Sequence, residues 1–227
     1  MVILFIVSLM ASASNLPSTV GSGSLPADLQ KQYDADLKFM AEIQPAGAAT
    51  PLHQKIFGDV NGAAYQEFYN SRVKKVVMGN CRSGPAIACV KRSNPSTINL
   101  TNNFVKYKHP QVARLMVIYH EARHTEVKNG SWGHKNCPVP FLDRTTGQPM
   151  KSIWSGAPLA GEPACDKTPF GSYGSSVILL KNIEKSCKNC TEKVRQDAGL
   201  YANDNFGRIV NEDARKQMIQ DLYASKK

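Results

Sequence analysis

His120, Glu121 and His124 form the one pattern in this chain that specifies a chemistry. With Ala122 and Arg123 between them they spell HExxH. In a helix, residues four apart lie on the same face, displaced by about 40° around the axis and about 6 Å along it. Two imidazoles placed in this way can bind one tetrahedral Zn²⁺ ion, at roughly 2.0–2.1 Å each. The spacing therefore predicts that His120 and His124 are zinc ligands.

Glu121 is the candidate catalytic base of this pattern. In a helix it lies about 100° round from His120, beside the metal without being forced to bind it. There it can take a proton from a water whose pKa the metal lowers toward neutrality. It can then carry that proton to a leaving amine, which is general acid–base catalysis.

The pattern lies in a segment with the composition of a buried helix. Pro110 suits a first helical position, because its missing N–H would have no partner there. Lys128 followed by Asn129-Gly130 suits a helix end. The apolar run 115–119 predicts burial on nearly all sides just before the motif. The alternative is a chance match on a solvated helix, but unpaired His and Glu side chains would be costly to bury here.

The span 97–134 resembles the zincin metallopeptidases. In that family a strand at the edge of a small sheet holds the extended substrate and precedes the HExxH helix, and residues 97–101 are its counterpart here. The resemblance implies an α+β fold, predominantly helical, with a small sheet beside a central HExxH helix. Arg123 and Glu126 depart from the family, which rarely has charged residues at these positions. Arg123 could pair with a carboxylate of the substrate or of the protein, but our interpretation of it is a surface charge.

A third metal ligand is expected from the chain beyond the motif helix. Zincin clans take it from a His six residues on, from a more distant Glu or from an Asp, and the six-residue spacing is absent here. His134, ten residues beyond His124, is our first choice because it is the nearest residue with ligand chemistry. Asp166 is the second choice and Glu162 the third. His53 and His109 are not expected to be ligands.

Asp166 and the run 171–174, Gly-Ser-Tyr-Gly, resemble the Asp and Tyr-Gly element of the aspzincin branch, with a longer separation. The hydroxyl of Tyr173 is therefore a candidate donor to the oxyanion that forms when water attacks a carbonyl. The alternative is an aromatic ring that simply packs beside two glycines.

Six cysteines, an even number, fit an oxidising compartment. Local spacing favours three pairs, Cys81 with Cys89, Cys137 with Cys165, and Cys187 with Cys190. A Cys137–Cys165 bridge would hold its Cα atoms about 5.5 Å apart and so bring His134 near Asp166. One of these two could bind the metal while the other orients a ligand. A zinc–thiolate cluster is the weaker alternative, because the chain has a single C-x-x-C.

The first residues predict export. An apolar run over 1–10 is followed by Ala-Ser-Ala at 11–13, which indicates a signal peptide, 1–13, cleaved near Ala13. The run is too short to span a bilayer, so we expect no integral membrane segment in the mature chain. A buried first helix is the alternative. The Ser-, Gly- and Pro-rich residues 14–26 predict a flexible leader.

The remaining residues, 27–227, are expected to form a single zincin-like catalytic domain with a helical C-terminal part. The 42% apolar composition of the full 227-residue chain suffices for an ordinary core. Apolar spacing and turn residues predict helices over 27–44, 51–73 with a break at 58–62, 177–183, 191–202 and 212–224, and strands over 74–78 and 97–105.

The formal charge of +10 is compatible with acidic partners. Because the basic residues are scattered and form no nucleic-acid motif, we expect no binding of nucleic acid. The sequence as a whole predicts a secreted or periplasmic monomer that uses Zn²⁺ to hydrolyse amide bonds in a protein, peptide or peptidoglycan substrate. The alternative is an exported metal-binding or structural protein without catalysis.

Overall fold

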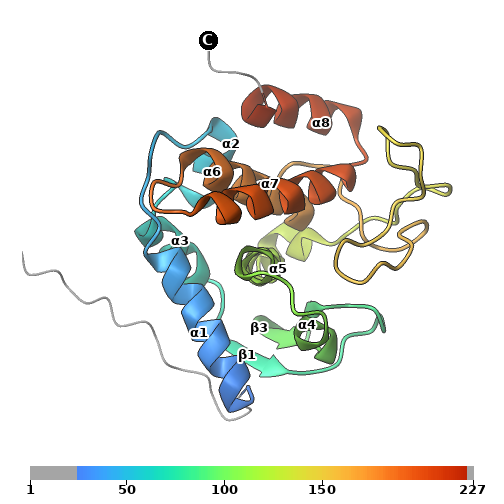
Figure 1. Cartoon of the computed structure of the whole chain (residues 1–227). Helices are drawn as coiled ribbons and strands as arrows, with labels where there is room; N and C mark the ends of the chain where they lie inside the picture. Colours follow the sequence, from blue (N-terminus) through green and yellow to red (C-terminus); the bar gives the residue numbers. More distant parts are fainter. Residues whose placement is uncertain (1–24, 224–227) are drawn as a thin grey trace, which may run out of the picture.

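The computed structural model describes residues 25–223 (Figure 1). The predicted signal peptide, 1–13, and all but the last two residues of the predicted leader, 14–26, lie outside this range. The helices are α1 (Ala27–Ala41), α2 (Pro51–Phe57), α3 (Gly62–Asn70), α4 (Asn102–Lys106), α5 (Gln111–His124), α6 (Ser172–Ser186), α7 (Glu192–Gly207) and α8 (Glu212–Met218), with a 3₁₀ segment η1 (Val127–Trp132) and a π turn η2 (Ile219–Tyr223). The strands are β1 (Lys75–Met78), β2 (Ala88–Lys91) and β3 (Asn94–Leu100).

The architecture is mixed α+β, with a small sheet beside the HExxH helix α5. Figure 1 shows α5 at the centre, with α6 and α7 on one side and the sheet on the other. The helix contacts α1, α6, α7, β2 and β3. Within residues 25–223, no helix combines the length and the apolar composition that a membrane span needs.

Helix α5 is buried along almost its whole length, as the apolar run predicted. Its residues 115–123 are all buried, and Ala113, Ile118 and Ala122 have no exposed surface. Two boundaries were predicted wrongly. Pro110 is the N-cap residue, and the α-helix ends at His124, before the 3₁₀ segment η1. The helix ends earlier than predicted because the apolar stripe ends at the motif, and the Asn-Gly pair lies within η1 instead.

The sheet has the strand order β1-β3-β2, so β3 is its central strand. Ile98 of β3 pairs with Val76 of parallel β1 and with Val90 of antiparallel β2. The prediction that residues 97–101 form an edge strand is therefore wrong. Residues 97–100 are buried on both faces of the strand, which is the environment of a central position. The strand at the sheet edge beside α5 is β2.

A long irregular segment, residues 133–171, connects η1 to α6. It packs around its own small core of Phe141, Met150 and Leu159 with the Cys137–Cys165 disulfide. Short backbone bridges hold it further, including one from Lys135 to Cys165. All three predicted disulfides are present, Cys81–Cys89, Cys137–Cys165 and Cys187–Cys190.

Helix α6 begins earlier than the sequence predicted. The prediction placed a helix over 177–183, and the structure starts it at Ser172. Ser172 and Gly174 were interpreted as loop residues, because small polar residues favour turns. They are buried here, where α6 packs closely against α5.

Candidate metal centre

The three predicted histidines meet at one point. His120 and His124 project from one face of α5, and His134 reaches them from the segment after η1. Their Nε2 atoms form a triangle, with 3.2 Å from His120 to His134, 3.2 Å from His120 to His124 and 3.1 Å from His124 to His134. The geometry that the HExxH spacing predicts is therefore present, with a third imidazole completing the cluster.

The hydrogen bonds on the outer nitrogens fix which nitrogen carries the proton. His124 Nδ1 lies 2.7 Å from the carbonyl oxygen of Ser131, and His134 Nδ1 lies 2.9 Å from Oδ1 of Asp166. A carbonyl and an ionised carboxylate only accept, so both Nδ1 atoms must donate. In a neutral imidazole the other nitrogen, Nε2, then has an unprotonated lone pair.

The ring of His120 is also hydrogen-bonded on its outer side, in this case to residues of helix α6. Its ring makes a hydrogen bond to the backbone of Ser172, and its Nδ1 lies 3.5 Å from Oγ of Ser176. Burial lowers the pKa of His120 well below its ordinary value, and the neighbouring histidines lower it further. Burial likewise lowers the pKa of His124 to about 3. These rings are therefore neutral near pH 7, and their Nε2 lone pairs face one another.

Three converging lone pairs at this separation repel each other, and a cation between them removes the repulsion. Two tetrahedral ligands at the usual zinc–nitrogen distance are about 3.3–3.4 Å apart, close to the sides of the observed triangle. Three imidazoles with their outer nitrogens hydrogen-bonded are also a donor set that suits zinc. The residues present therefore fit a zinc ion.

Asp166 orients His134 and does not join the triangle. Its Oδ1 accepts from His134, and its Oδ2 accepts from the backbone N–H of Tyr173 at 2.8 Å and of Gly174 at 3.4 Å. The adjacent Cys137–Cys165 bridge holds the two segments together, as expected. Glu162, the third choice as ligand, is exposed on the loop and lies outside the histidine cluster.

Glu121 lies beside the cluster with half of its carboxyl group unused. It is 5% exposed and accepts a hydrogen bond from the backbone of Val90 in the edge strand β2. Its Oε2 is buried without a hydrogen-bond partner among the described residues. Burial raises the pKa of Glu121 to about 8, although the Val90 N–H opposes this. A nearby cation would favour the ionised form of this group.

Tyr173 packs its ring against two of the histidines. The ring centroids lie 4.6 Å from His120 and 4.5 Å from His134. Arg208, 6% exposed and paired with Asp204, donates from Nη1 to the Tyr173 hydroxyl at 3.1 Å. Because the guanidinium only donates, the hydroxyl proton of Tyr173 remains free to point elsewhere.

Arg208 was missed by the sequence reasoning. Its backbone carbonyl also accepts from the N–H of Asp166, so one residue contacts both sides of the site. The i,i+4 spacing of Asp204 and Arg208 is a signal of a helical ion pair, but such pairs are common on exposed surfaces. Nothing in the sequence places this pair beside residue 173.

Arg123 is buried, which overturns its interpretation as a surface charge. It is 6% exposed, donates from Nε to the carbonyl oxygen of Phe170, and pairs through Nη1 with Glu126. The two charged residues that depart from the zincin pattern therefore compensate each other. A protein carboxylate as the partner of Arg123 was the alternative from sequence, but the burial was missed because an i,i+3 ion pair looks the same on a buried and on an exposed helix end.

The other two described histidines are used elsewhere, as expected. His53 bonds the carbonyl of Gly58 and the hydroxyl of Tyr65, and burial lowers its pKa to about 4. His109 bonds the Tyr201 hydroxyl at 2.6 Å and the carbonyl of Trp154 at 2.9 Å. In both residues the two ring nitrogens are already occupied.

Comparison with known proteins finds no match to this chain among protein-family models, curated proteins or solved structures. The resemblance to zincins consequently rests on the HExxH residues and their surroundings alone. The function of the site has to be inferred from the geometry of the histidine cluster and the side chains around it.

Proposed function

We propose that this protein is a zinc-dependent hydrolase that cleaves amide bonds in proteins, peptides or peptidoglycan. The observation that carries the proposal is the triangle of three histidine Nε2 atoms with a buried carboxyl group alongside. A zinc ion held there would supply a Lewis acid that polarises a carbonyl and acidifies water.

The protein side chains transfer the proton, stabilise the developing negative charge and orient the metal ligands. Glu121 accepts a proton through its unpartnered Oε2 and returns it to the leaving nitrogen. Tyr173, with its hydroxyl oriented by Arg208, donates a hydrogen bond to the carbonyl oxygen as negative charge develops there. Asp166 and Ser131 keep the rings of His134 and His124 in the tautomer that binds metal.

The edge strand β2 favours an extended substrate. Val90 of this strand contacts the catalytic carboxyl group, so a peptide chain added along the outer edge of β2 would pass beside Glu121. Main-chain pairing of this kind binds peptides with little dependence on their sequence. In the zincins, which this chain resembles, an edge strand has this role.

Export to an oxidising compartment is part of the proposal. Three disulfides persist only where thiols are not kept reduced, which supports a secreted or periplasmic location. We propose that the protein acts there as a monomer on soluble or cell-wall substrates. The charge of +10 favours acidic substrates over basic ones.

The test separates metal binding from catalysis. Purified protein is expected to contain one zinc ion per chain by mass spectrometry of the metal, and His124→Ala is expected to lose it. Glu121→Gln should retain the metal and lose hydrolysis of peptide and peptidoglycan substrates by about 100-fold or more, because general acid–base catalysis contributes this much. Unchanged hydrolysis in Glu121→Gln would remove Glu121 from the mechanism.

A metal-binding protein without catalysis is the second candidate. The burial that raises the pKa of Glu121 and leaves Oε2 unpartnered favours catalysis, because a merely structural glutamate would have its hydrogen bonds made. Zinc at one ion per chain, with no hydrolysis of any amide substrate and the same metal affinity in Glu121→Gln, would favour this second candidate.

A further inference from the structure

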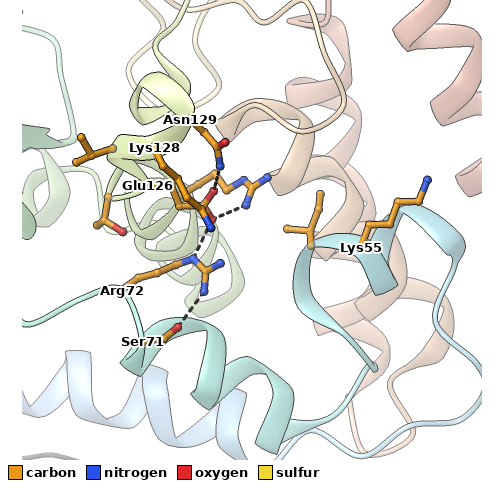
Figure 2. Close-up of a pocket in the computed structure, with 10 residues that line it drawn as sticks. Lys55, Ser71, Arg72, Glu126, Lys128 and Asn129 are labelled. Atoms are coloured by element: carbon orange, nitrogen blue, oxygen red, sulfur yellow. Dashed lines mark hydrogen bonds and ion pairs between the residues drawn. The ribbon is translucent and has the colours of Figure 1, made fainter.

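A polar pocket of about 660 Å³ lies at the C-terminal end of α5, between α2, the end of α3 and η1 (Figure 2). Its lining includes four basic side chains, Lys55, Arg72, Arg123 and Lys128, and one acidic side chain, Glu126. Ser71, Thr125 and Asn129 add uncharged polar groups to the wall. The pocket therefore has an excess of positive charge that the proposed hydrolysis does not use.

The single carboxylate of the pocket is fully occupied. Oε1 of Glu126 accepts from Nε of Arg72 and from Nη1 of Arg123. Oε2 accepts from Nδ2 of Asn129 at 2.9 Å and from Nε1 of Trp132 at 2.7 Å. Figure 2 shows the Glu126 carboxylate between Arg72 and Asn129. One negative charge is thus shared by two guanidinium groups and neutralises only one of them.

Each guanidinium keeps donors for a ligand. Arg72 uses Nε for Glu126 and Nη1 for Phe68 and Ser71, and Arg123 uses Nε for Phe170 and Nη1 for Glu126. Within residues 25–223, no hydrogen bond is made by Nη2 of either arginine, and no ion pair by the ammonium of Lys128. Arginine donors held in place by such contacts need no further ordering when an oxyanion binds.

We propose that this pocket binds a small oxyanion, the carboxylate or phosphate group of a ligand, through Arg72, Arg123 and Lys128. Both groups have several oxygen acceptors, which matches the donors that remain on two guanidinium groups meeting at Glu126. Lys55 lines the pocket from α2, but in Figure 2 its ammonium end is turned away from Arg72. It contributes to the electrostatic potential and makes no contact with the ligand.

The test is titration of the full-length protein with inorganic phosphate and, separately, with acetate, followed by NMR or calorimetry. Saturable binding is expected with at least one of the two anions, and the tighter one identifies the ligand group. Affinity should fall about tenfold or more in Arg72→Gln and roughly threefold to tenfold in Lys128→Gln, because each loses a positive charge beside the anion. Lys55→Gln, which removes the same charge outside contact distance, should change affinity by less than about twofold.

Arg72→Gln removes one of the two cationic partners of Glu126. The fold of this variant is therefore checked by circular dichroism. Lys128→Gln breaks no hydrogen bond or ion pair within residues 25–223 and keeps the test valid if Arg72→Gln unfolds. Because an anion could also bind at the histidine cluster, the titration is repeated after treatment with chelator, which should not abolish binding at the pocket. No saturable binding of either anion, or equal affinity in the native protein and Lys128→Gln, would overturn the proposal.

Discussion

The three histidines of the cluster differ in what holds their outer nitrogens. His124 relies on a backbone carbonyl, His120 on the backbone of Ser172, and His134 on the carboxylate of Asp166. A carboxylate acceptor makes an imidazole a stronger ligand than a carbonyl does, because its charge stabilises the metal-bound ring. His134 comes from an irregular segment rather than from a helix, so it depends most on this contact.

Asp166→Asn is expected to weaken zinc binding by roughly 10-fold to 100-fold. Both carboxylate oxygens of Asp166 accept hydrogen bonds, Oδ1 from His134 and Oδ2 from the N–H groups of Tyr173 and Gly174. An amide has a single acceptor oxygen, so the side chain of this variant must turn its NH₂ group toward one of these donors. Competition with a zinc-binding dye measures the affinity.

Asp28→Asn is the matched control, because Asp28 lies on the exposed side of α1 away from the cluster. It should leave the zinc affinity unchanged. Equal affinities in native protein and Asp166→Asn, with both proteins folded, would show that His134 needs no help from the carboxylate.

At the scale of elements, the N-terminal end of α6 organises much of the site. It supplies the two N–H groups that bind Asp166, the ring of Tyr173, and the Ser172 and Ser176 contacts to the α5 histidines. The small residues there let α6 lie close to α5. Gly171, the N-cap residue of α6, is part of this close packing, because a Cβ at this position would lie 2.3 Å from Oδ2 of Asp166.

Gly171→Ala should therefore lower zinc affinity by a mechanism that removes no polar group from the site. The added methyl group would displace the Asp166 carboxylate, which is already held by three donors and cannot move without breaking a hydrogen bond. We expect a loss of about 1–3 kcal/mol in unfolding free energy from overpacking, measured by urea denaturation, together with weaker zinc binding.

Gly84→Ala is the control for this substitution, since a Cβ at Gly84 has no neighbour within 4 Å. It should leave both quantities nearly unchanged. If Gly171→Ala bound zinc as tightly as Gly84→Ala, the position of the Asp166 carboxylate would not matter for the metal.

The helix α5 and the facing of His120 and His124 could be predicted from sequence because both are local. A run of apolar residues and a four-residue spacing determine them within a few turns of backbone. The pairing of His134 with Asp166 was also foreseen, because a disulfide next to both residues links distant segments. Local patterns could not show that β3 is central or that Arg208 reaches Tyr173, since both depend on how elements far apart in sequence pack.

At the scale of the whole molecule, the histidine cluster joins two parts with separate cores. The larger core surrounds α5, includes α6 and α7, and also takes in Trp154 of the irregular segment. The smaller core lies within residues 133–171. His120 and His124 belong to the first part, and His134 comes from the start of the second. A metal bound by all three would therefore attach the irregular segment to the helical core.

Removal of the metal should lower the stability of the whole protein. Zinc at about 1,000 times its dissociation constant would stabilise the folded state by about 4 kcal/mol, which corresponds to roughly 10 °C in melting temperature for a chain of this size. We expect calorimetry to show this decrease on addition of a chelator. Amide hydrogen exchange should rise first in the part of the segment around His134, because this residue would lose its bond to the metal while Phe170 keeps its hydrogen bond to Arg123 of α5.

The same measurement on His120→Ala provides the comparison, because this variant lacks a ligand while keeping residues 133–171 and all three disulfides intact. Its melting temperature should not respond to zinc or to chelator. If amide exchange around His134 were the same with and without chelator, although the chelator removes the zinc, the segment would be held by the Asp166 contacts with Arg208 and Ile209 instead.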